Sequence, residues 1–265
     1  MDDAPAIPRP GGEVILQSRL PFTPWADPGL ARLPGMMPAG DDWIVVDDAY
    51  AGQMALRRRL VNQHPADVVR TLVGSEAAQA EALDTMLAAL PSGFRRDGTR
   101  IVCPDGHVVR IDAPLPTLAR LFQEDVLLLI RDGREHVLVA GLLCFPASWT
   151  LAEKIGRPLA AIHAPVPHYD AALAARVQRL FDRAPPGRAI WRANVLGYRD
   201  PALHQPRPEG APRPDGPARF LRCERQTVLR LPRSDAILFA VHTYLLRPDA
   251  LTPRQRTTCP IDFAP

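Results

Sequence analysis

The sequence predicts an α+β fold in which hairpins build an antiparallel sheet, helices lie against one face, and a helical portion precedes the sheet. Helical spacing of apolar residues is concentrated in residues 47–90. Strand-like runs then come in pairs around short turns, which is typical of hairpins and not of βαβ units. Apolar residues make up 46% of the chain, which is enough for a sizeable core.

The 265 residues can form one large domain or two small ones. We expect a disordered lead over residues 1–20, a single domain over residues 21–250 and a polar tail over residues 251–265. Residues 14–42 are rich in Pro and Gly, so they favour an extended arm laid over the core rather than a helix.

The helical portion follows a short strand or turn at residues 43–50. Helical spacing then runs through AGQMALRRRLVNQH, is interrupted at Pro65 and resumes at VVRTLVG. A second helix is predicted for EAAQAEALDTMLAALP, which Pro91 ends.

Three hairpins are predicted from their turns, at residues 104–106, 131–134 and 232–235. A helical turn at TLARLFQ precedes the second hairpin, whose strands are apolar enough to be buried on both faces. Glu124 and Asp125 begin that hairpin, where a strand-start or Arg-pairing role is expected. AIWRANVLGY is a further candidate strand.

Composition excludes several classes of protein. A net charge of +3 gives no nucleic-acid or membrane signal, and no run approaches the roughly 20 apolar residues of a membrane span. The N-terminus lacks the pattern of a signal peptide. The four cysteines are far apart, which argues against a zinc ribbon, an iron–sulfur cluster and covalent haem. A cytoplasmic protein with free thiols is expected.

Residues 144–169 combine a short helix with a proline-braced loop. Thr150 and Glu153 have the spacing of a capping box, and Gly156 can close the helix in left-handed geometry. An amphipathic helix, YDAALAARVQRLFDRA, follows the loop.

The loop carries His163 and His168. A histidine in a loop is commonly only a polar contact. A single neutral imidazole that faces an apolar sheet is, however, what a five-coordinate haem needs.

Polar residues interrupt the first strand of the third hairpin at RCERQTVLRLP. Strand alternation places Glu224 and Gln226 on one face and Arg225 on the other. Buried charges need partners, so the segment is either a solvated face with salt bridges or the wall of a polar pocket. Arg192 and Asn194 in WRAN can bind a carboxylate or a partner.

Taken in chain order, QED with its apolar run, CFPASWTLAEKIGRPL, IHAPVPHY, WRAN and ERQTVLRLP resemble the haem-dependent oxidative N-demethylase family. The characterised type of that family is the haem-bearing α subunit of dimethylamine monooxygenase. The likeness extends from about Pro21 to about Leu246 and includes PFTPW, GDDWIVVDDAY and RRRL.

The resemblance implies a haem-binding PAS-like fold and reductive activation of O2 at haem b. It also implies oxidative N-demethylation of a small secondary amine such as dimethylamine, with release of formaldehyde. FMN, [2Fe–2S] and tetrahydrofolate are expected only on partner subunits, among them a separate flavin and iron–sulfur reductase.

The resemblance also implies site residues. His163 matches the family motif in IHAPVP and is expected to ligate the haem iron, with His168 as the alternative. Tyr169, Lys154 and Arg192 are expected in the cofactor pocket or at the propionates.

Glu224, Arg225 and Gln226 match the ERQT motif and are expected to act as catalytic residues in the wall of the pocket. One departure is Val195, where the family pattern has an aromatic residue, and it bears on the choice of substrate. Two other functions stay open on sequence grounds: a haem-based gas or redox sensor, and a haem-free PAS-like binding module.

Overall fold

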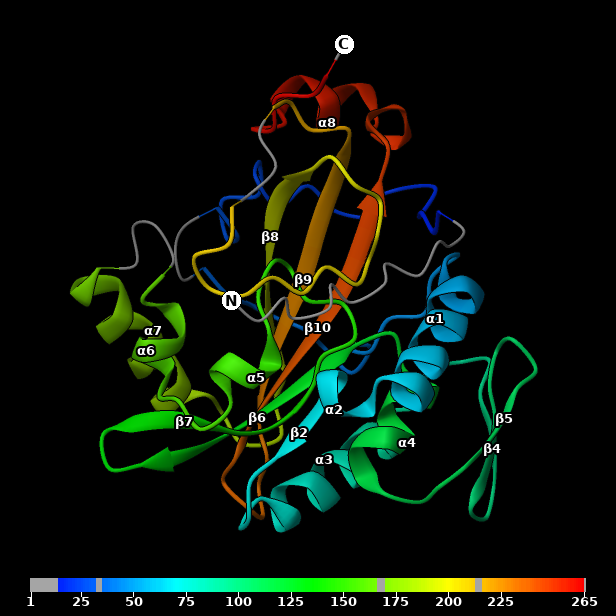
Figure 1. Cartoon of the computed structure of the whole chain (residues 1–265), viewed down its shortest axis with the longest axis vertical. Coiled ribbons are helices and arrows are strands. Elements are labelled where there is room, and N and C mark those ends of the chain that lie inside the picture. Colours follow the sequence, from blue (N-terminus) through cyan, green and yellow to red (C-terminus); the bar gives the residue numbers. More distant parts are fainter. Residues whose placement is uncertain (1–13, 32–34, 166–169, 213–215, 265) are drawn as a thin grey trace, which may run out of the picture.

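The computed structural model describes residues 14–31, 35–165, 170–212 and 216–264 (Figure 1). In this part of the chain the architecture is mixed α+β, with a seven-stranded antiparallel sheet and a separate three-stranded sheet. The large sheet has the strand order β1-β8-β9-β10-β6-β7-β2.

Two long hairpins form the centre of the large sheet, and each is closed by a turn that the sequence predicts. They are β6 (Asp125–Asp132) with β7 (Glu135–Leu142) and β9 (Phe220–Arg230) with β10 (Ile237–Leu246). Next to β9 lies β8 (Ile190–Tyr198), and the edges are β1 (Met37–Pro38) and β2 (Val69–Thr71). The second and third predicted hairpins and the predicted strand are therefore confirmed.

The front of the chain supplies one group of helices and the small sheet. The helices are α1 (Tyr50–Gln63), α2 (Pro65–Val68), α3 (Glu76–Ala88) and α4 (Pro114–Leu121). The small sheet contains β3 (Arg95–Asp97), β4 (Arg100–Val102) and β5 (Val108–Arg110), and its β4–β5 pair confirms the first predicted hairpin.

Residues 69–71, which follow the short helix α2, depart from the helical prediction. Val69 pairs with Leu142 and Thr71 pairs with Ala140, so this segment is the edge strand β2. β-Branched residues fit a pleated edge better than a helix, and the free edge of β7 supplies the backbone partners.

The helices after the second hairpin are α5 (Leu151–Lys154), α6 (Leu159–His163) and α7 (Ala171–Arg183). The expected tail also folds: η1 (Pro248–Ala250) leads to α8 (Pro253–Thr258), which begins with a capping box of Thr252 and Gln255. No helix in the described ranges is long and apolar enough to cross a membrane.

Helices lie on both faces of the large sheet, which corrects the prediction of one covered face. α1, α3 and α4 contribute to a core cluster with Val126 and Leu238, whereas α5, α6 and α7 contribute to another with Val228 and Ile237. In Figure 1, α6 and α7 lie on one side of β8, β9 and β10, and α1 lies on the other. The reason is that the central strands are apolar on both faces and must be covered on both. We call these the α1 face and the α6 face.

An N-terminal arm packs on the sheet, as the sequence predicts. Leu20 is buried, and the Phe22 ring lies 5.1 Å from the ring of Trp191. Gln17 is also buried and accepts a hydrogen bond of 2.7 Å from the backbone of Leu245. Of the expected disordered lead, residues 14–20 thus belong to the packed arm, and residues 1–13 lie outside the described residues.

Candidate functional site

The α6 face contains a patch of the central sheet that is only partly covered. On β6 and β10, Val126, Leu238 and Ala240 point to the α1 face and are at most 1% exposed. The partly exposed residues, which we call the open patch, are Leu127, Arg192, Gln226, Phe239 and Val241. A mainly apolar patch with polar groups at one side is suited to a flat organic ligand.

His163 is the last residue of α6, which packs on this face. Its Nδ1 lies 2.9 Å from the carbonyl oxygen of Leu159. Because a carbonyl only accepts hydrogen bonds, Nδ1 carries the proton and Nε2 carries the lone pair. This tautomer is the one that a metal-ligating imidazole adopts.

The surroundings of His163 keep the imidazole neutral. Burial lowers its pKa, the contact with the Leu159 carbonyl opposes that effect, and the positive charges of Lys154 and Arg192 lower the pKa further. These two cations come from α5 and β8, so the structure brings three of the predicted site residues together. A neutral imidazole is the form that binds iron.

Lys154 holds α6 in place rather than facing the open patch with an unpaired charge. Its Nζ donates to the carbonyl oxygen of Ile162 at 2.9 Å and forms an ion pair with Glu209. Gly156 closes α5 with φ +78°, as the sequence predicts. The predicted capping box is not formed, because the hydroxyl of Thr150 donates to the Glu153 carboxylate instead of capping the backbone.

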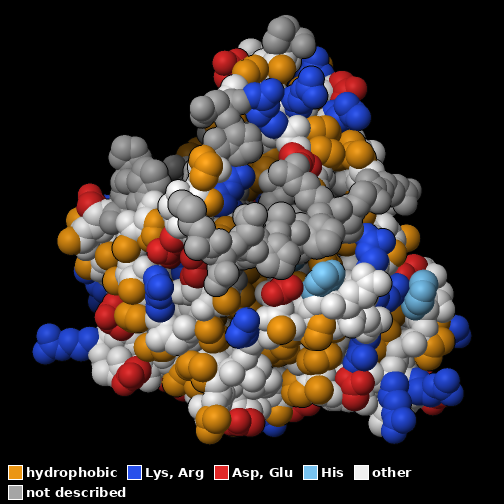
Figure 2. Space-filling view, in the orientation of Figure 1, with side chains coloured by type: hydrophobic (Ala, Val, Ile, Leu, Met, Phe, Trp, Pro, Cys, Tyr) orange, Lys and Arg blue, Asp and Glu red, His pale blue; other side chains and the backbone are white. Residues whose placement is uncertain are grey.

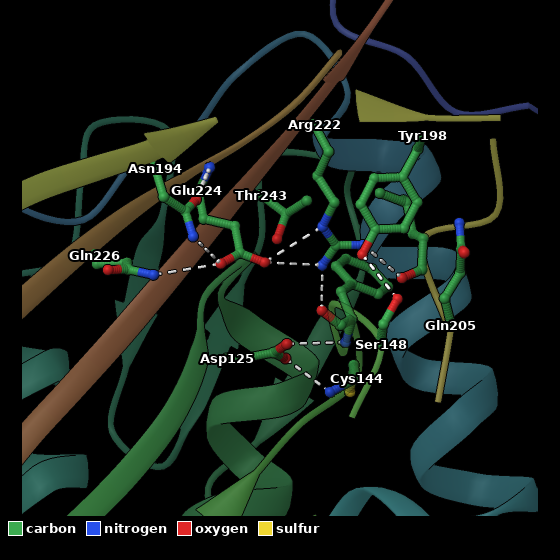
Figure 3. Close-up of polar contacts among 12 residues, drawn as sticks. Asp125, Cys144, Ser148, Asn194, Tyr198, Gln205, Arg222, Glu224, Gln226 and Thr243 are labelled. Carbon is green, nitrogen blue, oxygen red and sulfur yellow. Dashed lines mark hydrogen bonds and ion pairs between the residues drawn. The ribbon is translucent and has the colours of Figure 1, made fainter. Parts of the chain in front are cut away.

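A ladder of polar side chains crosses β8 and β9 beside the open patch (Figure 3). The Glu224 carboxylate is its centre: it accepts hydrogen bonds from Asn194 at 3.1 Å and Gln226 at 3.3 Å and lies 3.2 Å from the Arg222 guanidinium. Gln226 in turn accepts a bond of 3.1 Å from Arg192. Arg222, which is 0% exposed, therefore compensates the charge of Glu224.

Arg192 is the cation of this ladder that no carboxylate of the described residues pairs with. Burial lowers the pKa of its guanidinium, and the Glu224 charge partly opposes this. Its Nε is buried and lacks a hydrogen-bond partner within the described ranges. A buried donor without a partner costs free energy, so this atom is suited to a ligand carboxylate.

Arg225 is not brought to the open patch. Its Nη1 donates to the carbonyl oxygen of Trp43 at 2.6 Å, and its guanidinium lies 4.9 Å from the ring centroid of Trp191 on the α1 face. Val195 pairs with Cys223 and packs in the same cluster on that face. The departure at Val195 therefore lies away from the candidate site.

Two predicted residues cannot be placed, because His168 and Tyr169 lie outside the described residues. Among the other histidines, His242 is a buried, hydrogen-bonded residue of β10. Its Nε2 lies 3.0 Å from Asp47 and its Nδ1 lies 3.5 Å from Glu124. Burial disfavours the charged ring, but the two carboxylates raise its pKa to about 9.

The sequence did not single out Arg57, which lies under the site. This residue is 0% exposed and forms an ion pair of 2.6 Å with Asp125, which confirms the Arg-pairing role expected at the strand start. Helical spacing could have indicated that Arg57 is buried, since it occupies the apolar stripe of α1 between Met54 and Val61.

The residues present fit a haem. No group of three or more His, Cys, Asp or Glu side chains that could hold a metal ion occurs in the described part of the chain. A porphyrin needs only one such protein ligand, and His163 has the required tautomer. The open patch matches an apolar macrocycle, and the buried Nε of Arg192 matches a propionate.

Comparison with known families agrees with this geometry. Residues 36–258 match the family described as haem-dependent oxidative N-demethylase, alpha subunit-like. The match includes α6, the open patch and the polar ladder, and it confirms the resemblance drawn from the motifs. The description indicates a haem-dependent oxidoreductase, and the word subunit implies a larger assembly. The chain therefore belongs to the haem-dependent oxidative N-demethylase alpha subunit-like family.

Proposed function

We propose that this chain is the haem-bearing catalytic subunit of an oxidative N-demethylase for a small secondary amine of the dimethylamine kind. The proposal includes a PAS-like haem domain over residues 21–250 in a cytoplasmic protein. The observation that carries it is the placement of a neutral, correctly tautomeric His163 on the sheet face that holds the open patch.

In this proposal each pocket residue has one task. Nε2 of His163 would hold the iron of haem b, and the Leu159 carbonyl fixes the ring through Nδ1. Lys154 positions α6 through the carbonyl of Ile162. Arg192 binds a propionate with the Nε that otherwise lacks a partner.

The haem, when bound, supplies the reductive activation of O2. Overall, one N-methyl amine, O2, two electrons and two protons give the demethylated amine, formaldehyde and water. A separate reductase subunit with FMN and [2Fe–2S] supplies the electrons, and tetrahydrofolate likewise belongs to a partner subunit and not to this chain.

Glu224 and Gln226 form the polar wall of the pocket. Both ends of the Gln226 amide are engaged, one by Arg192 and the other by Glu224, so its orientation is fixed. This fixed wall lets the chain orient a small polar substrate beside the cofactor without a rearrangement of side chains.

Turnover tests the proposal directly. The haem-loaded protein is supplied with dimethylamine, O2 and an artificial electron donor, and formaldehyde is measured against amine consumed. We expect equal amounts of formaldehyde and demethylated amine, and none from tert-butylamine, which has no N-methyl group. A stable O2 complex without formaldehyde from dimethylamine, trimethylamine or sarcosine would contradict the enzymatic proposal and favour a sensor.

A further inference from the structure

A cavity lies at the far end of the sheet from α6. It has a volume of ≈ 480 Å³ and opens where β8 ends, β9 begins and β10 leaves the sheet. Phe220 in its lining is six positions along β9 from Gln226 of the open patch, roughly 20 Å away. The cavity is therefore separate from the proposed haem site.

Three arginines line this cavity: Arg199, Arg219 and Arg247. Figure 2 shows basic side chains gathered at the end of the molecule that carries α8 in Figure 1. Like charges that share one cavity repel each other, and proteins usually place a carboxylate between them. The cavity lining contains no Asp or Glu among the described residues.

Arg219 and Arg247 have no anionic partner among the residues that the structure describes. Within the described ranges, neither Arg219 nor Arg247 forms an ion pair or a side-chain hydrogen bond. The guanidinium of Arg247 is instead held 5.4 Å from the ring centroid of Phe220, which fixes its orientation at the cavity wall.

The size and chemistry of the cavity define a class of ligand. Its volume lies in the range of small-molecule sites. Guanidinium groups match the geometry of phosphate and carboxylate oxygens, and Arg219 and Arg247 together attract a polyvalent anion more strongly than a monovalent one. Phe220, Pro201 and Pro248 supply apolar wall for an organic part.

We propose that this cavity is a binding site for a polyvalent small anion of the diphosphate or tricarboxylate class. The ligand binds at the end of the sheet opposite the proposed haem site, and its binding depends on Arg219 and Arg247. The inference stands on this cavity alone, so it does not depend on the proposed function.

Calorimetric titration of the purified full-length chain tests the site, with pyrophosphate and citrate as separate probes at constant ionic strength. We expect saturable one-site binding of at least one probe, and the better probe distinguishes a phosphate from a carboxylate ligand. The double variant Arg219→Gln with Arg247→Gln should weaken it at least ten-fold, since each charge-assisted hydrogen bond is worth about a factor of ten.

The matched control is the double variant Arg95→Gln with Arg110→Gln, which removes the same charge from exposed positions of the small sheet. It should bind the probe as the unchanged protein does. Both double variants should keep the thermal midpoint of the unchanged protein. Equal affinities in all three proteins, or no saturable heat with either probe at millimolar concentration, would overturn the proposal.

Discussion

Arg192 is the side chain whose surroundings point most directly to a ligand. Its Nη1 bonds to Gln226, yet its Nε is buried and lacks a partner in the described part of the chain. Leaving a buried donor unsatisfied costs about 1–3 kcal/mol, and a charged donor more. A ligand carboxylate at this atom removes that cost, which is why we assign Arg192 to a haem propionate.

Arg192→Gln should therefore weaken haem binding by about ten-fold, because one charge-assisted hydrogen bond is lost. The position of the Soret band should not move, since the axial ligand is unchanged. Haem transfer to apomyoglobin measures the affinity, and Arg188→Gln removes an exposed arginine of the same region as the control. Equal affinities of the two variants would remove Arg192 from the pocket.

At the scale of elements, Asp125 joins three parts of the fold under the site. Its carboxylate pairs with Arg57 of α1 and accepts backbone hydrogen bonds from Cys144 at 2.7 Å and Phe145 at 2.8 Å. These hydrogen bonds and the ion pair connect the segment after β7 to the start of β6 and to α1. Arg222 supports the same segment, because it donates to the carbonyl oxygen of Phe145.

Asp125→Ala should destabilise the protein by about 3–5 kcal/mol, because it leaves Arg57 as a buried, unpaired cation. Urea unfolding followed by circular dichroism measures the change. Asp84→Ala is the control, since Asp84 on α3 forms an exposed ion pair with Arg233, and such pairs contribute little. Unfolding of both variants at the same urea concentration would show that Asp125 does not stabilise the contact between α1, β6 and the segment after β7.

Local signals in the sequence predicted most elements, because turns and caps are local. The three hairpins follow from residues such as Gly106 and Asp235, which adopt φ of +82° and +59° in their turns. The strand at residues 69–71 was missed, because its structure depends on the free edge of β7, which is distant in the sequence. The presence of helices on both faces of the large sheet was also not predicted, because it too depends on how distant segments pack.

At the scale of the whole molecule, the candidate site combines α5 and α6 with β8 and β9. Strand alternation alone separated Glu224 and Gln226 from Arg225, and the structure agrees. The motifs identified the family. Neither source of information could show that α6 lies on the face of Gln226 and not on that of Arg225, because this depends on how distant segments pack. The His163 assignment therefore depends on the tertiary arrangement.

The absorption spectrum of haem-reconstituted His163→Ala tests the central claim most directly. His107→Ala is the matched control, because the His107 side chain is 62% exposed at a hairpin turn. We predict that His163→Ala loses or shifts the Soret band, that added imidazole restores it, and that His107→Ala keeps the spectrum of the unchanged protein. A Soret band in His163→Ala identical to that of the unchanged protein would contradict the assignment of His163 as the haem ligand.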